Sequence, residues 1–303
     1  MTTAPVIQTR GLTKRYRGTD ALVDLDFDVA PGEVMGFLGP NGAGKTTTIR
    51  LLLGLIRPTS GTAELFGLDC QRDVVAIHRR LASVAGEASL WPGLTGAETL
   101  HLLGQVQGQV DTTYRDDLVD RFELDPSKKV RAYSKGNRQK VALIAALMCR
   151  PDLLILDEPT SGLDPLKEHE FRRCVVEARH RGQTVLLSSH VLGEVEALCD
   201  RVGILRQGRL IEVGTLADMR HLASTTVEVT FDGPVPDLAA VEGVRGVTVH
   251  GRQATLQVQG PMGPLLRALA AAEVNELRSR EPSLEELFLT LYGTDASRLT
   301  GAG

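Results

Sequence analysis

Hydrophobic residues follow two patterns in the first two thirds of the chain, and both predict β-strands. From Val23 to Val29, apolar residues alternate with aspartate, which is the period-two pattern of a half-buried strand. Continuous apolar runs at 34–38, 153–156 and 184–187 predict strands buried on both faces. Buried strands of this kind, separated by helical stretches, favour an α/β fold with a largely parallel sheet.

The pattern changes after Met219. Alternating runs then predict short strands, and a helical stretch from Leu265 to Ala272 separates the last of them. The predicted strands of this part are 227–231, 246–249, 254–258 and 274–277. We therefore expect two domains, 1–220 and 221–303, of which the second is a small α+β domain. Ser283 and Glu286 form a capping box, which predicts a final helix ending near Tyr292.

Composition agrees with two soluble globular domains. The chain has 303 residues, 42% of them hydrophobic, and a formal net charge of -4, so its overall charge does not favour nucleic acid or an anionic membrane surface. The four cysteines form no C-x-x-C pair, which argues against zinc and disulfides and fits a reducing cytoplasm. No apolar run approaches the roughly 18 residues of a membrane span, so we expect any spanning segment to belong to a partner.

A phosphate-loop motif, G-x-x-x-x-G-K-[ST], directly follows the strand predicted at 34–38. Its glycines allow backbone N–H groups to face phosphates, and a helix predicted from Thr46 to about Leu53 directs its positive dipole end at them. Lys45 is expected to reach the β- and γ-phosphates, and the Thr46 hydroxyl to hold Mg²⁺. The predicted nucleotide-binding residues of this loop are Gly39, Pro40, Asn41, Gly42, Ala43, Gly44, Lys45, Thr46 and Thr47.

Three polar residues follow the other two buried strands. Asp157 and Glu158 end one of them, at the sheet edge where open α/β sheets bind ligands. We expect Asp157 to hold Mg²⁺, directly or through water, and Glu158 to polarise the attacking water. His190 ends the other strand, where its imidazole is able to donate to a γ-phosphate oxygen. Lys45, Glu158 and His190 are therefore the predicted catalytic residues.

A third motif, Ser134-Lys135-Gly136-Asn137-Arg138-Gln139, opens a helix that runs into the strand before Asp157. With the phosphate loop and the acid pair, it resembles the ATPase subunit of ATP-binding cassette (ABC) transporters, over roughly Val6 to Gly214. The resemblance implies ATP and Mg²⁺ as ligands. It also implies that residues 1–220 form a P-loop NTPase domain of ABC type, with a mixed-sheet core, an antiparallel β subdomain and a helical subdomain at about 87–150.

The resemblance further implies a role for each matched motif. Adenine would stack on Tyr16, and the signature Ser134, Lys135, Gly136 and Asn137 would contact the γ-phosphate held by another subunit. Asp164 would lie in a loop across the dimer interface, and His190 would be the switch histidine. Physical chemistry supports the signature role, because the helix after Ser134 presents its N-terminus to an anion. The structural alternatives are a plain N-cap for Ser134 and simple packing for Tyr16.

Two segments depart from the family pattern. Gly86 stands where a glutamine is usual, with Glu87 beside it, and an ionised Glu accepts hydrogen bonds but cannot donate them. Glu87 is expected either to touch Mg²⁺ or its water, or to lie in a loop that mainly serves a partner contact. Lys135 and Asn137 replace the more common Gly and Gln. They place a cation near the partner's triphosphate, which predicts stronger and more salt-dependent attraction between subunits.

These departures, with the late run from Glu281 to Phe288, look most like the ATPases that drive drug-exporting and antibiotic-resistance ABC-2 type permeases. The resemblance implies a multi-spanning permease partner and a location at the cytoplasmic face of the cell membrane. It also implies a homodimer, or a heterodimer with a similar ATPase, that closes on ATP and moves the region between about Trp91 and Val130. For the second domain, stabilising or regulating the dimer and a purely structural role both stay open.

Other classes fit the sequence less well. A soluble ABC-type ATPase acting on ribosomes or nucleic acid is the alternative, but the ribosomal type is expected to carry two cassettes and the DNA-repair type a long coiled coil. No nucleic-acid partner is expected. A GTPase needs an Asn-Lys-x-Asp guanine reader, and none of the three asparagines begins one. A scaffold with a dead site is disfavoured because Lys45, Asp157, Glu158 and His190 are all present.

Overall fold

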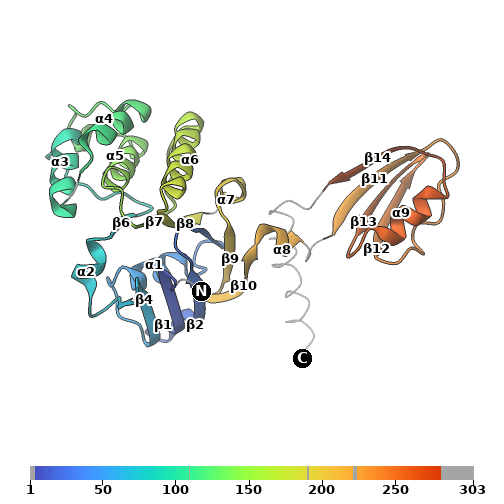
Figure 1. The fold of residues 1–303 in the computed structure, drawn as a ribbon, viewed down its shortest axis with the longest axis horizontal. Coiled ribbons are helices and arrows are strands. Elements are labelled where there is room, and N and C mark those ends of the chain that lie inside the picture. Colours follow the sequence, from blue (N-terminus) through green and yellow to red (C-terminus); the bar gives the residue numbers. More distant parts are fainter. Residues whose placement is uncertain (1–3, 109, 190, 221–223, 281–303) are drawn as a thin grey trace. The chain divides into compact units, whose positions relative to one another are not determined.

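The computed structural model describes residues 4–108, 110–189, 191–220 and 224–280. The chain divides into two compact units, Met1–Val213 and Gly214–Gly303 (Figure 1). Within the described parts of both units, no helix is long and apolar enough to cross a membrane.

A six-stranded sheet forms the centre of the first unit, in the order β10-β9-β3-β8-β7-β6. The pairs β3–β8, β3–β9, β6–β7 and β7–β8 are parallel, so the carboxyl ends of these strands meet at one edge. Every residue of β3, β7 and β8 is buried, which confirms the three strands predicted from continuous apolar runs. The strands are β3 (Val34–Leu38), β6 (Leu81–Val84), β7 (Leu153–Asp157), β8 (Thr184–Ser189), β9 (Arg201–Arg206) and β10 (Arg209–Thr215).

A second, antiparallel sheet of this unit has the order β2-β1-β4-β5. Its strands are β1 (Ile7–Tyr16), β2 (Thr19–Val29), β4 (Ser60–Leu65) and β5 (Leu68–Asp69). The alternation predicted for β2 is confirmed, because Leu25, Phe27 and Val29 are buried while the aspartates between them are exposed. The Phe27 ring packs on Phe37 of β3, with centroids 4.8 Å apart. This contact joins the antiparallel sheet to the six-stranded sheet.

Helices pack around these sheets, and three of them, α3 to α5, group together in Figure 1. A capping box of Thr95 and Glu98 begins α3, and Asp111 caps α4. Arg121 at the end of α4 forms an ion pair of 3.0 Å with Glu177 of α6, which ties the helical group to the sheet core. The helices of this unit are α1 (Lys45–Leu52), α2 (Val74–His78), α3 (Gly96–Gln107), α4 (Thr112–Arg121), α5 (Lys135–Leu147), α6 (Pro165–His180) and α7 (Leu192–Leu198).

Within the described residues, the second unit has an antiparallel sheet and two helices, of which α8 (Leu216–Arg220) precedes the sheet. Its other elements are β11 (Thr225–Phe231), β12 (Val244–His250), β13 (Gln253–Val258), α9 (Gly263–Ala270) and β14 (Val274–Arg280), with the strand order β12-β13-β11-β14. Alternate residues of β11 and β13 are buried and pack with Leu265 and Leu269 of α9. The α+β prediction is therefore confirmed. The helix predicted between Ser283 and Tyr292 lies outside the described residues.

Candidate functional site

The phosphate loop connects β3 to α1, and its backbone requires glycine at two points. Gly44 caps the helix with φ of 112°, in the left-handed region. A Cβ at Gly39 would come within 2.5 Å of the Leu205 carbonyl oxygen, which only glycine avoids. The loop is therefore held close to the end of β9 as well as to its own helix.

Lys45 lies folded into this loop. Its ammonium Nζ donates to the Gly39 carbonyl oxygen at 2.5 Å and lies 3.8 Å from Glu158 Oε1. The side chain is 6% exposed. Burial lowers the pKa of Lys45, while the charges of Glu158 and Asp157 act in the opposite direction. A buried cation is thus placed between the loop and the acid pair.

Asp157, the last residue of β7, accepts hydrogen bonds from two hydroxyl groups. Thr46 Oγ1 donates to Asp157 Oδ2 at 2.9 Å, and the Ser188 hydroxyl at the end of β8 donates to Oδ1. Parallel pairing sets Asp157 opposite Ser188, which explains why the two side chains meet. The oxygens of Thr46 and Asp157 are hard ligands of the kind Mg²⁺ prefers, so the residues present fit this ion.

Glu158 has a left-handed backbone, with φ of 48°. Its N–H donates to the Ser188 carbonyl oxygen at 3.0 Å and lies 3.3 Å from Ser188 Oγ. A non-glycine residue with positive φ is strained and persists only where its surroundings hold it, and here Ser188 does so. Sequence reasoning missed Ser188, although its place beside His190 at a strand end was a usable signal.

Gly86 follows β6 and reaches the same edge of the sheet. A Cβ at this position would be 3.5 Å from the Asp157 carbonyl oxygen and 3.7 Å from Glu158 Cβ, both ordinary contact distances. The side chain of Glu87 is exposed. The structure therefore brings Gly86 beside the acid pair, and the role of Glu87 stays a prediction.

The start of α5 carries the signature motif. Ser134 is its N-cap, and Ser134 Oγ accepts from the Asn137 N–H at 3.2 Å. A Cβ at Gly136 would approach the Gly162 carbonyl oxygen to 2.3 Å, so only glycine fits there. Lys135 Nζ donates to Ser161 Oγ at 2.9 Å. The signature thus packs against the segment that follows Glu158.

Two further contacts extend this packing along 159–164. Gln139 Nε2 donates to the Pro159 carbonyl oxygen at 3.0 Å, and Lys140 Nζ lies 4.0 Å from Asp164 Oδ2. Asp164 is the N-cap of α6, accepting from the Lys167 N–H. Gln139 and Lys140 escaped sequence reasoning, which assigned a role only to the start of the signature. They fix the signature helix to the loop that contains Asp164.

The remaining residues of the predicted site are Tyr16 and His190. Tyr16 ends β1 with 43% exposure, and Lys14 Nζ lies over its ring, 4.9 Å from the centroid, so the stacking role of Tyr16 stays a prediction. His190 lies outside the described residues. Ser189 Oγ beside it donates to Glu194 Oε2 at 2.7 Å and accepts from the Val191 N–H at 3.0 Å. Across residues 4–108, 110–189, 191–220 and 224–280, no three His, Cys, Asp or Glu form a metal-binding group.

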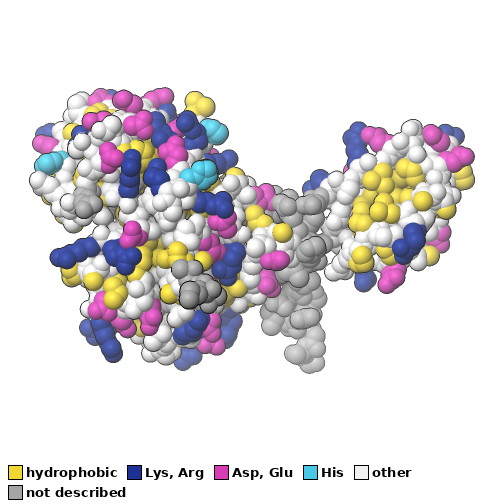
Figure 2. All heavy atoms as spheres, viewed as in Figure 1, with side chains coloured by type: hydrophobic (Ala, Val, Ile, Leu, Met, Phe, Trp, Pro, Cys, Tyr) yellow, Lys and Arg dark blue, Asp and Glu magenta, His cyan; other side chains and the backbone are white. Residues whose placement is uncertain are grey.

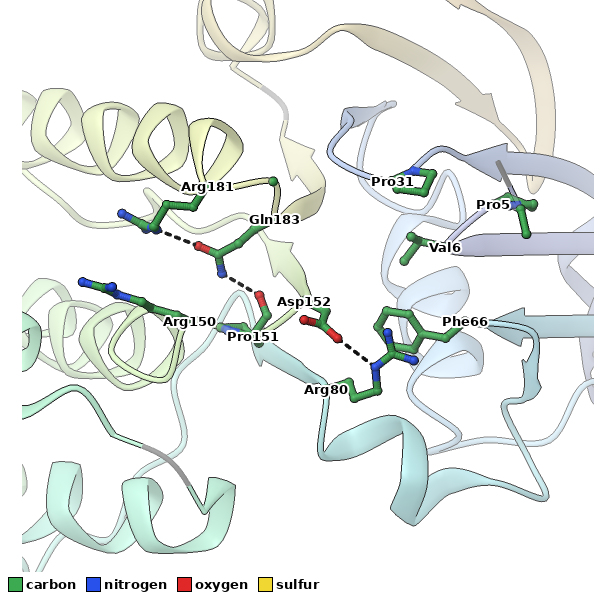
Figure 3. Close-up of a pocket in the computed structure, with 12 residues that line it drawn as sticks. Pro5, Val6, Pro31, Phe66, Arg80, Arg150, Pro151, Asp152, Arg181 and Gln183 are labelled. Carbon is green, nitrogen blue, oxygen red and sulfur yellow. Dashed lines mark hydrogen bonds and ion pairs between the residues drawn. The ribbon is translucent and has the colours of Figure 1, made fainter. Parts of the chain in front are cut away.

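A large pocket lies at the opposite edge of the six-stranded sheet, before the strands begin (Figure 3). Its volume is about 610 Å³. Arg80 Nε pairs with Asp152 at 2.8 Å, and the Arg80 guanidinium lies 3.8 Å from the Phe66 ring centroid. Gln183 donates to the Pro151 carbonyl oxygen. The pocket includes none of the predicted site residues.

Comparisons with known proteins bear on both units. A family model described as ABC transporter matches residues 22–161, and one described as the C-terminal domain of DrrA1-3-like ATP-binding proteins matches residues 214–292. The chain is 36% identical over 316 residues to the daunorubicin/doxorubicin resistance ATP-binding protein DrrA of Streptomyces peucetius, covering 98% of this chain and 96% of that protein. It is 41% identical over 210 residues to the bacitracin transport ATP-binding protein BcrA of Bacillus licheniformis, covering 68% and 69%.

Solved structures agree with this relationship. The ATP-binding subunit of an ABC transporter superposes with a TM-score of 0.68 at 33% identity, covering 72% of this chain and 92% of that one. A dimeric ATP-binding cassette in a post-hydrolysis state with ADP and phosphate shares the fold, with a TM-score of 0.64 at 22% identity, covering 69% and 98%. The predicted ABC-type fold is confirmed. The chain belongs to the ABC transporter family, as an ATP-binding and ATP-hydrolysing subunit with a DrrA-like C-terminal domain.

Proposed function

We propose that this chain powers an ABC-2 type exporter of drugs or other hydrophobic compounds through ATP-driven closure of a dimer. The observation that carries the proposal is the cluster of Lys45, Thr46, Asp157 and Glu158 at one sheet edge. The names of the relatives, resistance to daunorubicin and doxorubicin and transport of bacitracin, support the drug-export direction. No relative named above supports the alternative of an ATPase acting on ribosomes or nucleic acid.

The cluster provides one half of an ATP site. Thr46 and Asp157 would hold Mg²⁺, which when bound neutralises charge on the phosphates. Lys45 leaves the Gly39 carbonyl and donates to the β- and γ-phosphate oxygens. Glu158, held by Ser188 against its own backbone strain, orients and polarises the attacking water. In this proposal His190 donates to a γ-phosphate oxygen.

The signature provides the other half, for ATP held by a second subunit. Ser134 and Gly136 lie at the start of α5, where the helix dipole favours an anion. The close approach of Gly136 to Gly162 makes the signature move together with the loop that follows Glu158. Each subunit thereby couples the hydrolysis of its own ATP to the contact that its signature makes with the ATP of the other subunit. The second subunit is a copy of this chain or a similar ATPase.

An apolar groove between β6 and helices α3 and α5 suits the permease contact. It has a volume of about 320 Å³ and is lined by Leu90, Leu103 and Val106, the last of which is 78% exposed. Such a groove accepts the apolar face of a short helix, which we assign to a multi-spanning ABC-2 type permease. Ala85 and Ala88, on either side of Gly86 and Glu87, also line it. The groove therefore connects a permease at the cytoplasmic face of the membrane to the acid pair.

Glu158→Gln tests the catalytic part of the proposal. The variant should bind ATP, accumulate as a closed dimer in sedimentation experiments, and release phosphate about 10³-fold more slowly, within the range of general-base contributions. Glu242→Gln, an exposed change in the second unit, is the matched control and should behave as wild type. Phosphate release by Glu158→Gln at the wild-type rate would remove Glu158 from the mechanism.

Val106→Lys tests the permease contact separately. Because Val106 is 78% exposed, the substitution should leave folding and basal ATP turnover unchanged while the co-purification of a multi-spanning polypeptide from membranes is lost. Val75→Lys is the control, since Val75 is 71% exposed on α2, outside the groove. Unchanged co-purification with Val106→Lys would contradict the assigned groove.

A further inference from the structure

Strand β14 forms one edge of the sheet in the second unit. Within the described residues it pairs only with β11, so its other side presents backbone N–H and C=O groups to a further strand. Its residues from Asn275 to Arg280 are all exposed. Such an edge is a template for pairing with another chain, unless the fold blunts it.

The two edges of this sheet differ in regularity. On β12, the pairing register shifts between Arg245 and Thr248, and Gly246 between them has a φ of 57°. Irregularities of this kind bend an edge and discourage pairing. On β14, the one shift lies at the start of the strand, between Val274 and Glu276, and the register with β11 is unbroken from Glu276 to Arg280. The β14 edge is therefore the one that is suited to accept a strand.

Charges along β14 select its partner. Glu276 and Arg278 lie on one face of the strand, where Arg278 Nε is 2.8 Å from Glu276 Oε1. When two copies of β14 run antiparallel with Leu277 opposite Leu277, Glu276 of each copy faces Arg278 of the other. Opposite charges at facing positions stabilise a strand pair, and like charges destabilise it. Centring the pair on Glu276 or Arg278 instead sets two like charges opposite each other.

The other face of β14 also fits this register. Leu277 is 40% exposed and pairs with Val229 of β11, which is buried beneath α9 in the core of the unit. Figure 2 shows hydrophobic side chains gathered on this unit. Two Leu277 side chains at a two-fold axis would cover each other and extend the apolar row that begins at Val229. Both faces thus favour pairing centred on Leu277.

We propose that the β14 edge is a homodimerisation surface, at which two copies of the chain pair antiparallel about Leu277 into one continuous sheet of their second units. The surface is isologous, because Glu276 meets Arg278 in both directions. It includes no residue of the ATP site, so it does not depend on the function proposed above. It keeps two chains associated while no nucleotide joins their ATP-binding units.

Charge reversal at one position tests the register. In Glu276→Arg, the introduced arginine of each copy lies opposite Arg278 of the other, which makes two like-charge pairs per dimer. The dimer dissociation constant should therefore rise about tenfold or more. The measurement is sedimentation equilibrium of the full chain without nucleotide and with EDTA. Arg278→Glu should weaken the dimer in the same way. Arg245→Glu, on the bulged β12 edge, is the control and should dimerise as wild type.

Mixing the two defective variants provides the decisive result. Glu276→Arg chains and Arg278→Glu chains present opposite charges at both facing positions, so a mixed dimer should form with the wild-type dissociation constant. Far-UV circular dichroism checks that Arg278→Glu folds, because Glu228 lies opposite Arg278 in the same sheet. A monomeric wild-type chain, full dimerisation of either variant, or a failure of mixing to restore the dimer would overturn the proposal.

One further variant separates this surface from ATP-driven association. Lys45→Ala removes the buried cation of the phosphate loop and leaves β14 untouched, so its nucleotide-free dimer should match that of the wild type. The experiments therefore distinguish a loss of ATP-driven closure with the β14 dimer intact from a loss of the β14 dimer with closure intact. A weaker nucleotide-free dimer for Lys45→Ala would assign the contact to the ATP-binding unit and contradict the proposal.

Discussion

The two edges of the six-stranded sheet contrast in chemistry and in shape. At the carboxyl ends of the strands, hydrogen bonds join Thr46, Asp157 and Ser188, and a buried lysine faces Glu158. At the amino ends lies a pocket of about 610 Å³, held by an exposed ion pair between Arg80 and Asp152. The large pocket therefore lies at the edge of the sheet that does not carry the proposed catalytic residues. In the proposed function this is expected, because each chain provides only half of an ATP site and leaves it open.

Removing the buried lysine should have the largest effect on this contrast. Lys45→Ala leaves the phosphate loop without its cation, and we expect turnover to fall about 10³-fold, in the range seen when a positioned electrostatic donor is lost. Calorimetric titration with ATP should show weakened binding as well. Near-normal turnover would show that the carboxyl edge is not the reactive one.

Ser188→Ala should have a smaller effect at the same edge. It removes the donor to Asp157 Oδ1 and one partner of the Glu158 N–H, and the loss of a buried hydrogen bond costs about 1 to 3 kcal/mol. Turnover should fall about tenfold, read as kcat at saturating ATP. Ser83→Ala, at an exposed position of β6, is the control. Equal kcat for the two variants would leave Ser188 without a positioning role.

Glu194→Gln should change how stability depends on pH. Burial raises the pKa of Glu194 above its ordinary value of 4.5, against the opposing effects of the Ser189 hydrogen bond and the Arg172 charge. The folded state then binds the proton more tightly than the unfolded state, and this stabilisation is lost as pH rises from about 4.5 through the folded pKa. Wild type should therefore lose stability relative to Glu194→Gln over that rise, measured by urea unfolding. A pH-independent difference would contradict this.

Arg80→Ala, at the amino edge, should have the smallest effect. Its ion pair with Asp152 joins side chains that are 48% and 59% exposed, and exposed pairs contribute about 0 to 1 kcal/mol. Turnover should stay within twofold of wild type, and thermal unfolding should shift by a few degrees at most. A large fall in turnover would break the contrast between the two edges and give the pocket a catalytic role.

The sequence predicted those parts of the site that depend on local order along the chain. The phosphate loop and the pair Asp157 and Glu158 were predicted as site residues because the loop directly follows β3 and the pair stands at the end of β7. Their roles stay predictions. Ser188 was missed because its role depends on the register between β7 and β8, which sets it opposite Asp157, 31 residues earlier in the sequence. The close approach of Gly136 to Gly162 depends on how a helix packs on a loop, which no local pattern encodes.

The second unit shows the same limit. Alternation along β11 and β13 predicted both strands, since one face of each is buried. The position of β14 beside β11, at the edge of the sheet that the described residues form, was not predictable, because the order β12-β13-β11-β14 is set by pairing between distant segments.

The contact between Lys45 and the Gly39 carbonyl has a consequence for selectivity among anions. The Lys45 ammonium group already donates to a carbonyl oxygen, so a ligand must replace this hydrogen bond. The binding free energy of the ligand is therefore reduced by the free energy of the bond that is broken. A singly charged anion gains little from such an exchange, whereas a triphosphate gains several charged contacts at once. In the proposed function, the loop would therefore favour a triphosphate over a small, singly charged anion.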